Sequence, residues 1–241
     1  MKKNKILALS LCTCLAATAV VGGTLAYFTD TDAATNVFTT GDVKIDLIED
    51  FDAENAKLIP GIDVTKKVTV QNTGSEAAYV RVHVAIPSML DSGSKDQPQY
   101  AAYNNTLHFN FSKDSIEEGQ WNWSTATDGS NYPGNGGKWN SYQTTVEGIS
   151  YNVYVITYET ALASDQTTST EAMNKVYLDT KVTNEGMAEI LKELGTIKIL
   201  VAAEGGQSAG FDNAYDALNT QFGTPGEYTV NWTAVEAVPA E

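Results

Sequence analysis

The chain has 241 residues, with 30 Asp and Glu residues against 15 Lys and Arg, and a formal net charge of −15. So few cations cannot form a basic surface of useful size, which excludes nucleic acid as a partner and makes an anionic membrane surface a poor one. Both cysteines, Cys12 and Cys14, lie near the N-terminus. The rest of the chain therefore has no thiol for a disulfide, a zinc–thiolate site or a nucleophile.

The first residues have the pattern of an export signal. Lysines within the first five residues precede an uncharged stretch, 6–26, that ends in small residues. This order predicts a signal peptide over residues 1–26, cleaved between Ala26 and Tyr27. An uncleaved anchor is the alternative, because a stretch of about 20 apolar residues can span a bilayer. After cleavage the chain would carry 12 basic and 30 acidic residues, a net charge of −18, and no stable membrane span.

Apolar and polar side chains alternate along many short runs of residues 27–241, as in strands with one buried face. In the clearest run, 79–86, Val and Ile residues alternate with Tyr79, Arg81, His83 and Ala85. Similar runs are 42–48, 67–71, 107–111, 151–159, 175–183, 196–203 and 227–235. Many short strands separated by polar turns predict a mainly β fold, a jelly-roll-like β-sandwich formed by residues 27–241 as a single domain.

Two segments have helical periodicity instead. Apolar residues recur at i, i+3, i+4 and i+7 in about 185–194 and again in 211–222. Asn184 is the expected N-cap of the first helix, and Gly195 and Gly223 are expected to end the two helices. We expect both apolar faces to pack on the sandwich.

Three of the four tryptophans, Trp121, Trp123 and Trp139, lie in a Gly- and Asn-rich segment, 119–142. Aromatic faces beside amide groups suit the stacking of sugars, so this segment could bind carbohydrate. The alternative is a long loop between strands that buries its own aromatic side chains.

The sequence contains none of the common hydrolase, nucleotide-binding or zinc-peptidase motifs. The only histidines, His83 and His108, fall on the polar faces of their predicted strands. If those strands were neighbours, the two imidazoles with Asp63 or Glu76 could hold zinc. The alternative is that both histidines are exposed at the surface. Because the common catalytic motifs are missing from the sequence, we expect no enzyme activity and no cofactor.

The N-terminal third of the chain resembles a known family of bacterial exported proteins. Residues 21–30 and 36–47 are similar to the leader and first strand of proteins processed by the signal peptidase SipW, a group that includes TasA and camelysin. Residues 58–63 and 68–75 resemble the family's L-x-P-G-D and N-x-G-S elements, with Ile62 inserted before the aspartate. The specific resemblance covers residues 18–86.

The resemblance implies a jelly roll, a SipW-type signal peptidase as partner, and secretion to the cell surface or extracellular matrix. For TasA-like members it also implies assembly into biofilm fibres, in which the N-terminal segment of one subunit completes the sheet of the next. Residues 27–38 would then be an exchangeable donor strand, with Tyr27, Phe28, Val37 and Phe38 as its apolar contacts. The alternative is an arm that folds back as an edge strand of its own domain.

The sequence therefore predicts a secreted structural protein of the cell surface or biofilm matrix that self-associates or binds a fibre partner. Through camelysin the resemblance also implies a surface metalloendopeptidase, although no zinc motif stands in this sequence to carry that activity. A carbohydrate-binding adhesin that uses the tryptophans is the third hypothesis.

Overall fold

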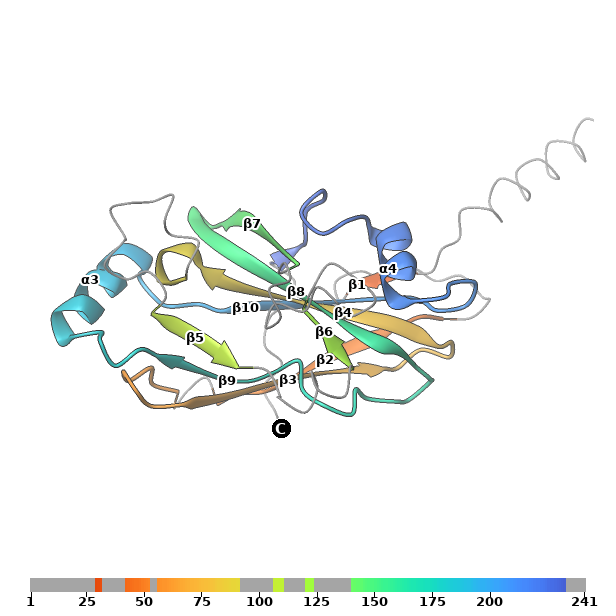
Figure 1. Cartoon of the computed structure of the whole chain (residues 1–241), viewed down its shortest axis with the longest axis horizontal. Coiled ribbons are helices and arrows are strands. Elements are labelled where there is room, and N and C mark those ends of the chain that lie inside the picture. The colour runs from red at the N-terminus through yellow and green to blue at the C-terminus, as the bar shows by residue number, and fades with distance from the viewer. Residues whose placement is uncertain are drawn as a thin grey trace, which may run out of the picture.

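The structure is a computed structural model that describes residues 29–31, 42–52, 56–91, 106–110, 120–123 and 140–232. Within these ranges ten strands form two antiparallel sheets, accompanied by two α-helices and one short 3-10 helix, η1 (Ser88–Leu90) (Figure 1). The prediction of a mainly β fold with two short helices is confirmed, and the two packed sheets are compatible with a jelly roll.

The two sheets have different sizes. The larger one has the order β1 (Thr29–Thr31), β10 (Leu200–Gln207), β4 (Ala78–Pro87), β8 (Ile149–Leu162) and β6 (Trp121–Asn122), and β7 (Ser141–Val146) also pairs with β8. The smaller one has the order β2 (Ile45–Asp50), β3 (Val64–Asn72), β9 (Met173–Leu178) and β5 (Leu107–Asn110). Strand β4 is central to the larger sheet because it pairs with β10 on one side and with β8 on the other.

The main hydrophobic core lies between the sheets. The inward side chains of β4 are Val80, Val82, Val84 and Ile86, all fully buried. They form one cluster with inward residues of the smaller sheet, which include Val68 and Val70 of β3 and Met173, Val176 and Leu178 of β9. The alternation in 79–86 thus does mark a buried face, as the sequence predicts.

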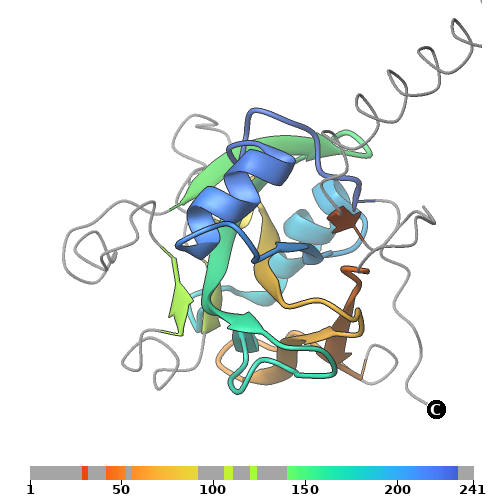
Figure 2. The same ribbon diagram turned by 90° about the vertical axis from the view of Figure 1, so that its right-hand side faces the viewer.

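The outer face of the larger sheet is covered as well. Helix α4 (Ala214–Phe222) contacts β4, β8 and β10, and Figure 2 shows it lying across that sheet. Residues 223–232, which we call the strap, continue from α4 toward β7 (Figure 1). Tyr228, Val230 and Trp232 of the strap pack in a second apolar cluster with residues of the sheet that include Ala85 and Val153.

Helix α3 (Asn184–Leu194) buries Ile190 in the main core. Its N-cap is Thr183 rather than the expected Asn184, because the Thr183 hydroxyl accepts a hydrogen bond of 3.1 Å from the Gly186 amide. Gly195 ends the helix at a positive φ of 68°, as expected.

The second helix begins later than the predicted residue 211. Asn213 is its N-cap, and its side chain accepts a 2.9 Å hydrogen bond from the Asp216 amide. Gly223 ends this helix at a φ of 98°. The apolar spacing therefore predicted both helices, while the capping side chains fix where they start.

Several strand predictions need correction. The run 196–203 becomes strand only from Leu200, and 175–183 only as far as Leu178. No strand forms in the described part of 227–235, because Tyr228, Val230 and Trp232 alternate against the sheet without pairing to a neighbouring strand. Alternation of apolar and polar residues indicates which side chains are buried. An extended segment that lies across a sheet shows the same alternation as a strand that is hydrogen-bonded within it.

Candidate functional site: a buried ionic network

Arg81 is the only arginine in the sequence, and it is buried with 2% of its surface exposed. It lies on the outer face of β4, where its backbone register partner on β10 is Glu204. Phe222 and Tyr228 place their rings 5.7 Å from the centre of the guanidinium group. A permanently charged group at a buried position needs full hydrogen bonding.

The guanidinium group receives that bonding from three different segments. Its Nε donates to Glu204 Oε2 over 2.6 Å, and Nη1 donates to Asn219 Oδ1 of α4 over 2.8 Å. Nη2 donates to the Gly223 carbonyl over 3.0 Å and to the Tyr228 hydroxyl over 2.8 Å. Because a lysine lacks the planar fork, it could not hold sheet, helix and strap at once.

His83 lies two residues farther along β4 on the same face and is fully buried. Its Nε2 lies 3.1 Å from Glu204 Oε2, and its Nδ1 lies 3.2 Å from the Tyr142 hydroxyl of β7. The neutral tautomer that carries its proton on Nε2 satisfies both contacts, donating to Glu204 and accepting from Tyr142. The prediction of an exposed histidine is therefore wrong for His83.

The ring of His83 is also enclosed by aromatic side chains. Tyr142, Tyr228 and Trp232 approach it edge-on, with ring centres 5.9, 6.5 and 6.4 Å away. Two of these rings belong to the strap. The strap therefore closes over the imidazole.

The charges in the network are balanced when His83 is neutral. Burial alone would raise the pKa of Glu204, but the hydrogen bond with His83, the charge that His83 carries when protonated, the charge of Arg81 and the hydrogen bond from Tyr228 lower it to about 2. Burial lowers the pKa of His83, and this outweighs the opposing effect of Glu204. At neutral pH the site thus holds one cation, Arg81, and one anion, Glu204.

The order of hydroxyl, imidazole and carboxylate in Tyr142, His83 and Glu204 is that of a catalytic triad. A nucleophile in such a triad needs an activated, accessible hydroxyl. Burial, and then the charge of Glu204, raise the pKa of Tyr142, so its hydroxyl keeps its proton. Since His83 is also fully buried, these three side chains stabilise the fold and do not activate a nucleophile.

The structure does not bring the two histidines together. His83 belongs to the larger sheet, whereas His108 lies on β5 at the edge of the smaller one. His108 stacks on Tyr177 and places its Nε2 3.4 Å from Asp179 Oδ2. The zinc site considered for this pair is therefore absent from the described geometry.

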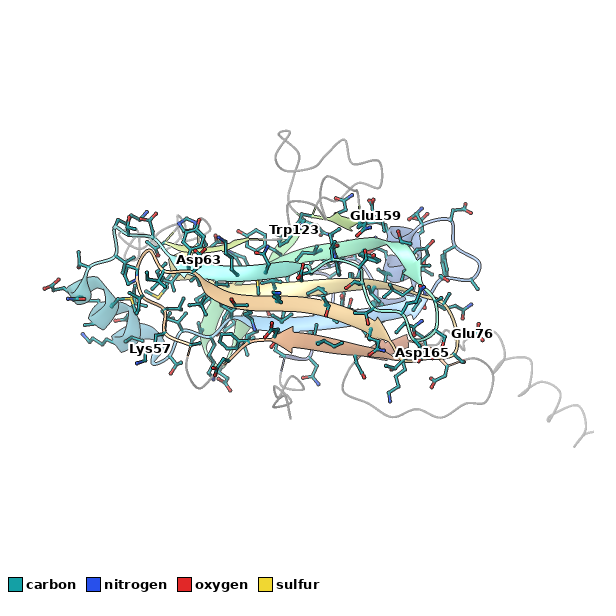
Figure 3. The ribbon with its side chains drawn as sticks, turned by 90° about the horizontal axis from the view of Figure 1, so that it is seen from below. Lys57, Asp63, Glu76, Trp123, Glu159 and Asp165 are labelled. Atoms are coloured by element: carbon teal, nitrogen blue, oxygen red, sulfur yellow. The ribbon has the colours of Figure 1, made fainter. Side chains whose placement is uncertain are left out.

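The two carboxylates considered with them are also apart. Figure 3 shows Asp63 and Glu76 near opposite ends of the sandwich. Asp63 accepts a 2.6 Å hydrogen bond from Lys175 Nζ. Across the described ranges, no group of three or more His, Cys, Asp or Glu residues could hold a metal ion.

Two of the three candidate sugar-binding tryptophans are buried. Trp121 and Trp123 have 1% and 0% of their surface exposed and belong to the main core. Trp121 Nε1 donates to the Thr170 carbonyl over 3.0 Å. Neither ring offers a face to a sugar, because both faces are packed, and Trp139 lies outside the described residues.

The predicted cleavage site and most of the predicted donor strand fall outside the part of the chain that the structure describes. Ala26, Tyr27, Phe28, Val37 and Phe38 all lie outside the described residues. The described part of that arm is β1, which pairs antiparallel with β10 at the edge of the larger sheet. In this single chain β1 is thus an edge strand of its own sheet.

Sequence reasoning missed Glu204, Tyr142 and Tyr228 as members of one site. A signal was present: the sole arginine and a histidine share one face of the clearest strand, and Glu204 is an isolated charge in the otherwise uncharged run 200–207. An isolated charge on a buried strand normally needs an opposite charge beside it. Tyr228 carried no comparable signal.

The structure defines a two-sheet β protein with an N-terminal edge strand and a covered outer face. Residues 2–118 match the family described as camelysin metallo-endopeptidase, which confirms the TasA- and camelysin-like resemblance of the chain. A search of curated proteins finds no match. Among the described helices, none is long and apolar enough to cross a membrane.

The matched segment does not correspond to a self-contained sheet. Strand β4 lies inside it, but both neighbours of β4, which are β8 and β10, lie beyond residue 118. Arg81 and His83 are likewise inside the match, whereas Glu204 is outside it. The buried network thus joins the family-like part to the remainder of the chain.

Proposed function

We propose that this chain is a secreted structural protein of the cell surface or biofilm matrix, which assembles when β1 of one copy pairs with β10 of the next. The observation that carries the proposal is the pairing of β1 in the single chain. Within the described part of the arm three residues are paired, Thr29 with Gly206, Asp30 with Gly205 and Thr31 with Glu204, and they lie at the edge of the sheet. An edge strand has a neighbour on one side only, and an identical strand from another copy can take its place at low cost.

The position of β1 supports exchange between copies. Cleavage after Ala26 would leave β1 two residues from a free N-terminus, so that no preceding chain would hold it in place. The same antiparallel hydrogen bonds form whether the strand comes from its own chain or from a neighbour. An extended arm of residues 27–38 spans roughly 40 Å at about 3.3 Å per residue, which is enough to reach a second copy.

A disulfide between paired positions tests this proposal. The double variant Thr29→Cys, Gly206→Cys places two thiols at register partners of a chain that has no other cysteine after residue 14. A Cβ at residue 206 would lie 3.0 Å from Gln221 Nε2, so the Gln221 amide, which hydrogen-bonds the backbone of Gln207, has to shift by a few tenths of an ångström to admit it. The oxidised monomer has its arm locked in place and should form no fibres.

Reduction of the locked protein should restore assembly, which makes the same sample its own control. Oxidation after assembly should instead link subunits into ladders on a non-reducing gel. The single variant Thr29→Cys should assemble with or without oxidant. Fibres grown from the locked monomer at the normal rate would rule out strand exchange through β1.

The metallo-endopeptidase activity in the family's description is the alternative. A hydrolytic zinc site needs three protein ligands and a bound water, and the described residues do not supply such a group. His83 is already committed to Glu204 and Tyr142. Casein cleavage that a chelator stops, and that the double variant His83→Ala, His108→Ala lacks, would establish the peptidase instead.

A further inference from the structure

The strap is attached to the sheet by apolar packing and by the buried network. Val230 and Trp232 are buried in the outer apolar cluster. Arg81 donates to the Gly223 carbonyl, and the Tyr228 hydroxyl donates to Glu204 over 2.7 Å. These contacts hold both the start and the middle of the strap against the sheet.

The strap also fits closely against β7. Gly226 has a φ of 91°, and a Cβ at this position would lie 2.8 Å from the Cβ of Tyr142. The Tyr142 hydroxyl in turn contacts His83. The Tyr142 side chain therefore contacts both the strap and His83, so that a change in the protonation of His83 can be transmitted to the strap.

The surroundings of His83 leave no place for a second positive charge. The ionisable groups that face it are Glu204 from β10, Arg81 from its own strand, Tyr142 from β7 and Tyr228 from the strap. Its backbone neighbours on β10 and β8 are Ala202 and Val155, both apolar. Because Arg81 already neutralises Glu204, a protonated imidazole would add an unpaired charge to a buried site.

We propose that His83 is the trigger of a pH-sensitive latch, in which uptake of a proton by its imidazole releases the strap, residues 223–232, from the larger sheet. Release exposes the imidazole to water, where its charge is solvated. It also frees the apolar outer face that Val230 and Trp232 cover. The latch requires no assembly of the protein and holds whether or not β1 is exchanged between copies.

The pH range of the latch follows from the two states of His83. Burial lowers the pKa of His83 in the closed state, whereas an exposed imidazole has a pKa of about 6.5. Below about pH 6.5 the open state binds a proton more readily than the closed state does, so the ratio of open to closed molecules rises with falling pH, by at most about tenfold per pH unit. The closed state is accordingly favoured at neutral pH and loses stability as the pH falls.

Glu204 does not interfere in the upper part of this range. Its carboxyl remains ionised in the closed state because its hydrogen bonds with His83 and Tyr228 and the charge of Arg81 lower its pKa, and an exposed glutamate takes up protons only near its usual value of 4.5. Opening between about pH 6.5 and pH 5 therefore reports His83 rather than Glu204.

Hydrogen exchange measured by mass spectrometry tests the latch on the secreted chain. We expect the protection of the strap, corrected for the intrinsic exchange rate, to fall between about pH 6 and pH 5, by at most about tenfold. Peptides from β3 should keep their protection and serve as the internal reference. Unchanged protection of the strap over this range would overturn the proposal.

Two matched histidine variants separate His83 from other causes. His83→Gln keeps a hydrogen-bond donor near Glu204 but cannot be protonated, so its strap protection should not change between about pH 6 and pH 5. His108→Gln removes the other histidine, on the smaller sheet, and should retain the wild-type pH response. A pH response that persists in His83→Gln would assign the opening to another group.

Nuclear magnetic resonance of the wild-type imidazoles covers the case in which His83→Gln fails to fold. His83 should become protonated only together with the loss of strap protection. Titration of His83 near pH 6.5 with the strap still protected would overturn the latch. Tyr228→Phe provides a further check, because loss of its hydroxyl should raise opening at every pH without changing the dependence on pH.

Discussion

Arg81 and Glu204 face each other across β4 and β10, and their side chains meet at 2.6 Å with only 2% of each exposed. The pair joins a strand of the camelysin-like segment to a strand outside it. Breaking a buried pair leaves one charge unpaired, which costs far more than losing an ion pair at the surface. This contact should therefore control how firmly the outer face of the larger sheet is covered.

Replacement of Arg81 by lysine should destabilise the protein although the charge is kept. A lysine has three donors on a single nitrogen and cannot make all four of the hydrogen bonds that Arg81 donates to Glu204, Asn219, Gly223 and Tyr228. We expect a loss of about 2 to 4 kcal/mol in the free energy of unfolding, measured by urea denaturation.

Lys198→Ala is a suitable control for this substitution. Lys198 pairs with Glu147 over 2.9 Å, but both side chains are at least half exposed. Loss of this pair should change the free energy of unfolding by less than about 1 kcal/mol. Equal effects of the two substitutions would contradict the central role of Arg81.

Glu204 should contribute stability that disappears in acid. Its folded pKa is lowered from 4.5 to about 2, so the contribution is complete above about pH 4.5 and is lost as the pH falls toward 2. A shift of this size corresponds to about 3 kcal/mol. Unfolding measured by circular dichroism from neutral to acidic pH should show this loss.

Glu204→Gln should be less stable at neutral pH and should lose little more between about pH 4.5 and pH 2, since it has no carboxyl at this position. Glu147→Gln, at an exposed site, is the matched control and should follow the wild type. An unaltered acid profile in Glu204→Gln would show that another carboxylate is responsible.

Export should remove residues 1–26. The lysines at the start, the uncharged stretch and the small residues before Tyr27 fit a signal peptidase site. N-terminal sequencing of the secreted protein should begin at Tyr27. Recovery of the chain in the membrane fraction with Lys2 still present would favour the uncleaved anchor.

Self-association should become faster as salt is added. A chain with a net charge of −18 after cleavage repels its copies, and physiological ionic strength screens this repulsion over about 8 Å. Light scattering at increasing sodium chloride concentration would measure the rate. Slower assembly in salt would indicate that opposite charges, rather than strand pairing, hold the subunits together.

Removal of the arm is a separate test of assembly. Deletion of residues 27–36 removes β1 and should leave a folded, β-rich monomer by circular dichroism, because the larger sheet keeps β10, β4 and β8. Electron microscopy of the concentrated protein should then show no fibres. Normal fibres from the truncated chain would contradict the role proposed for β1.

Much of the fold follows from local patterns in the sequence. The alternation in 79–86 predicts a strand with a buried face, and the 3.6-residue spacing of apolar side chains predicts both helices. Gly195 and Gly223 end those helices because glycine adopts positive φ without strain. These features depend on residues close together in the chain, so no tertiary contact is needed to recognise them.

The outer face of β4 was decided by residues far away in the sequence. Arg81 and His83 have the polarity of an exposed face, and exposure is the natural prediction for them. They are buried because α4 and the strap, more than 130 residues later, cover them and because Glu204 supplies the balancing charge. The sequence determined that this chain is a mainly β protein in which residues 79–86 form an alternating strand. Only the tertiary structure decided that both faces of that strand are buried, since burial of a charge depends on partners that only the folded chain brings within hydrogen-bond distance.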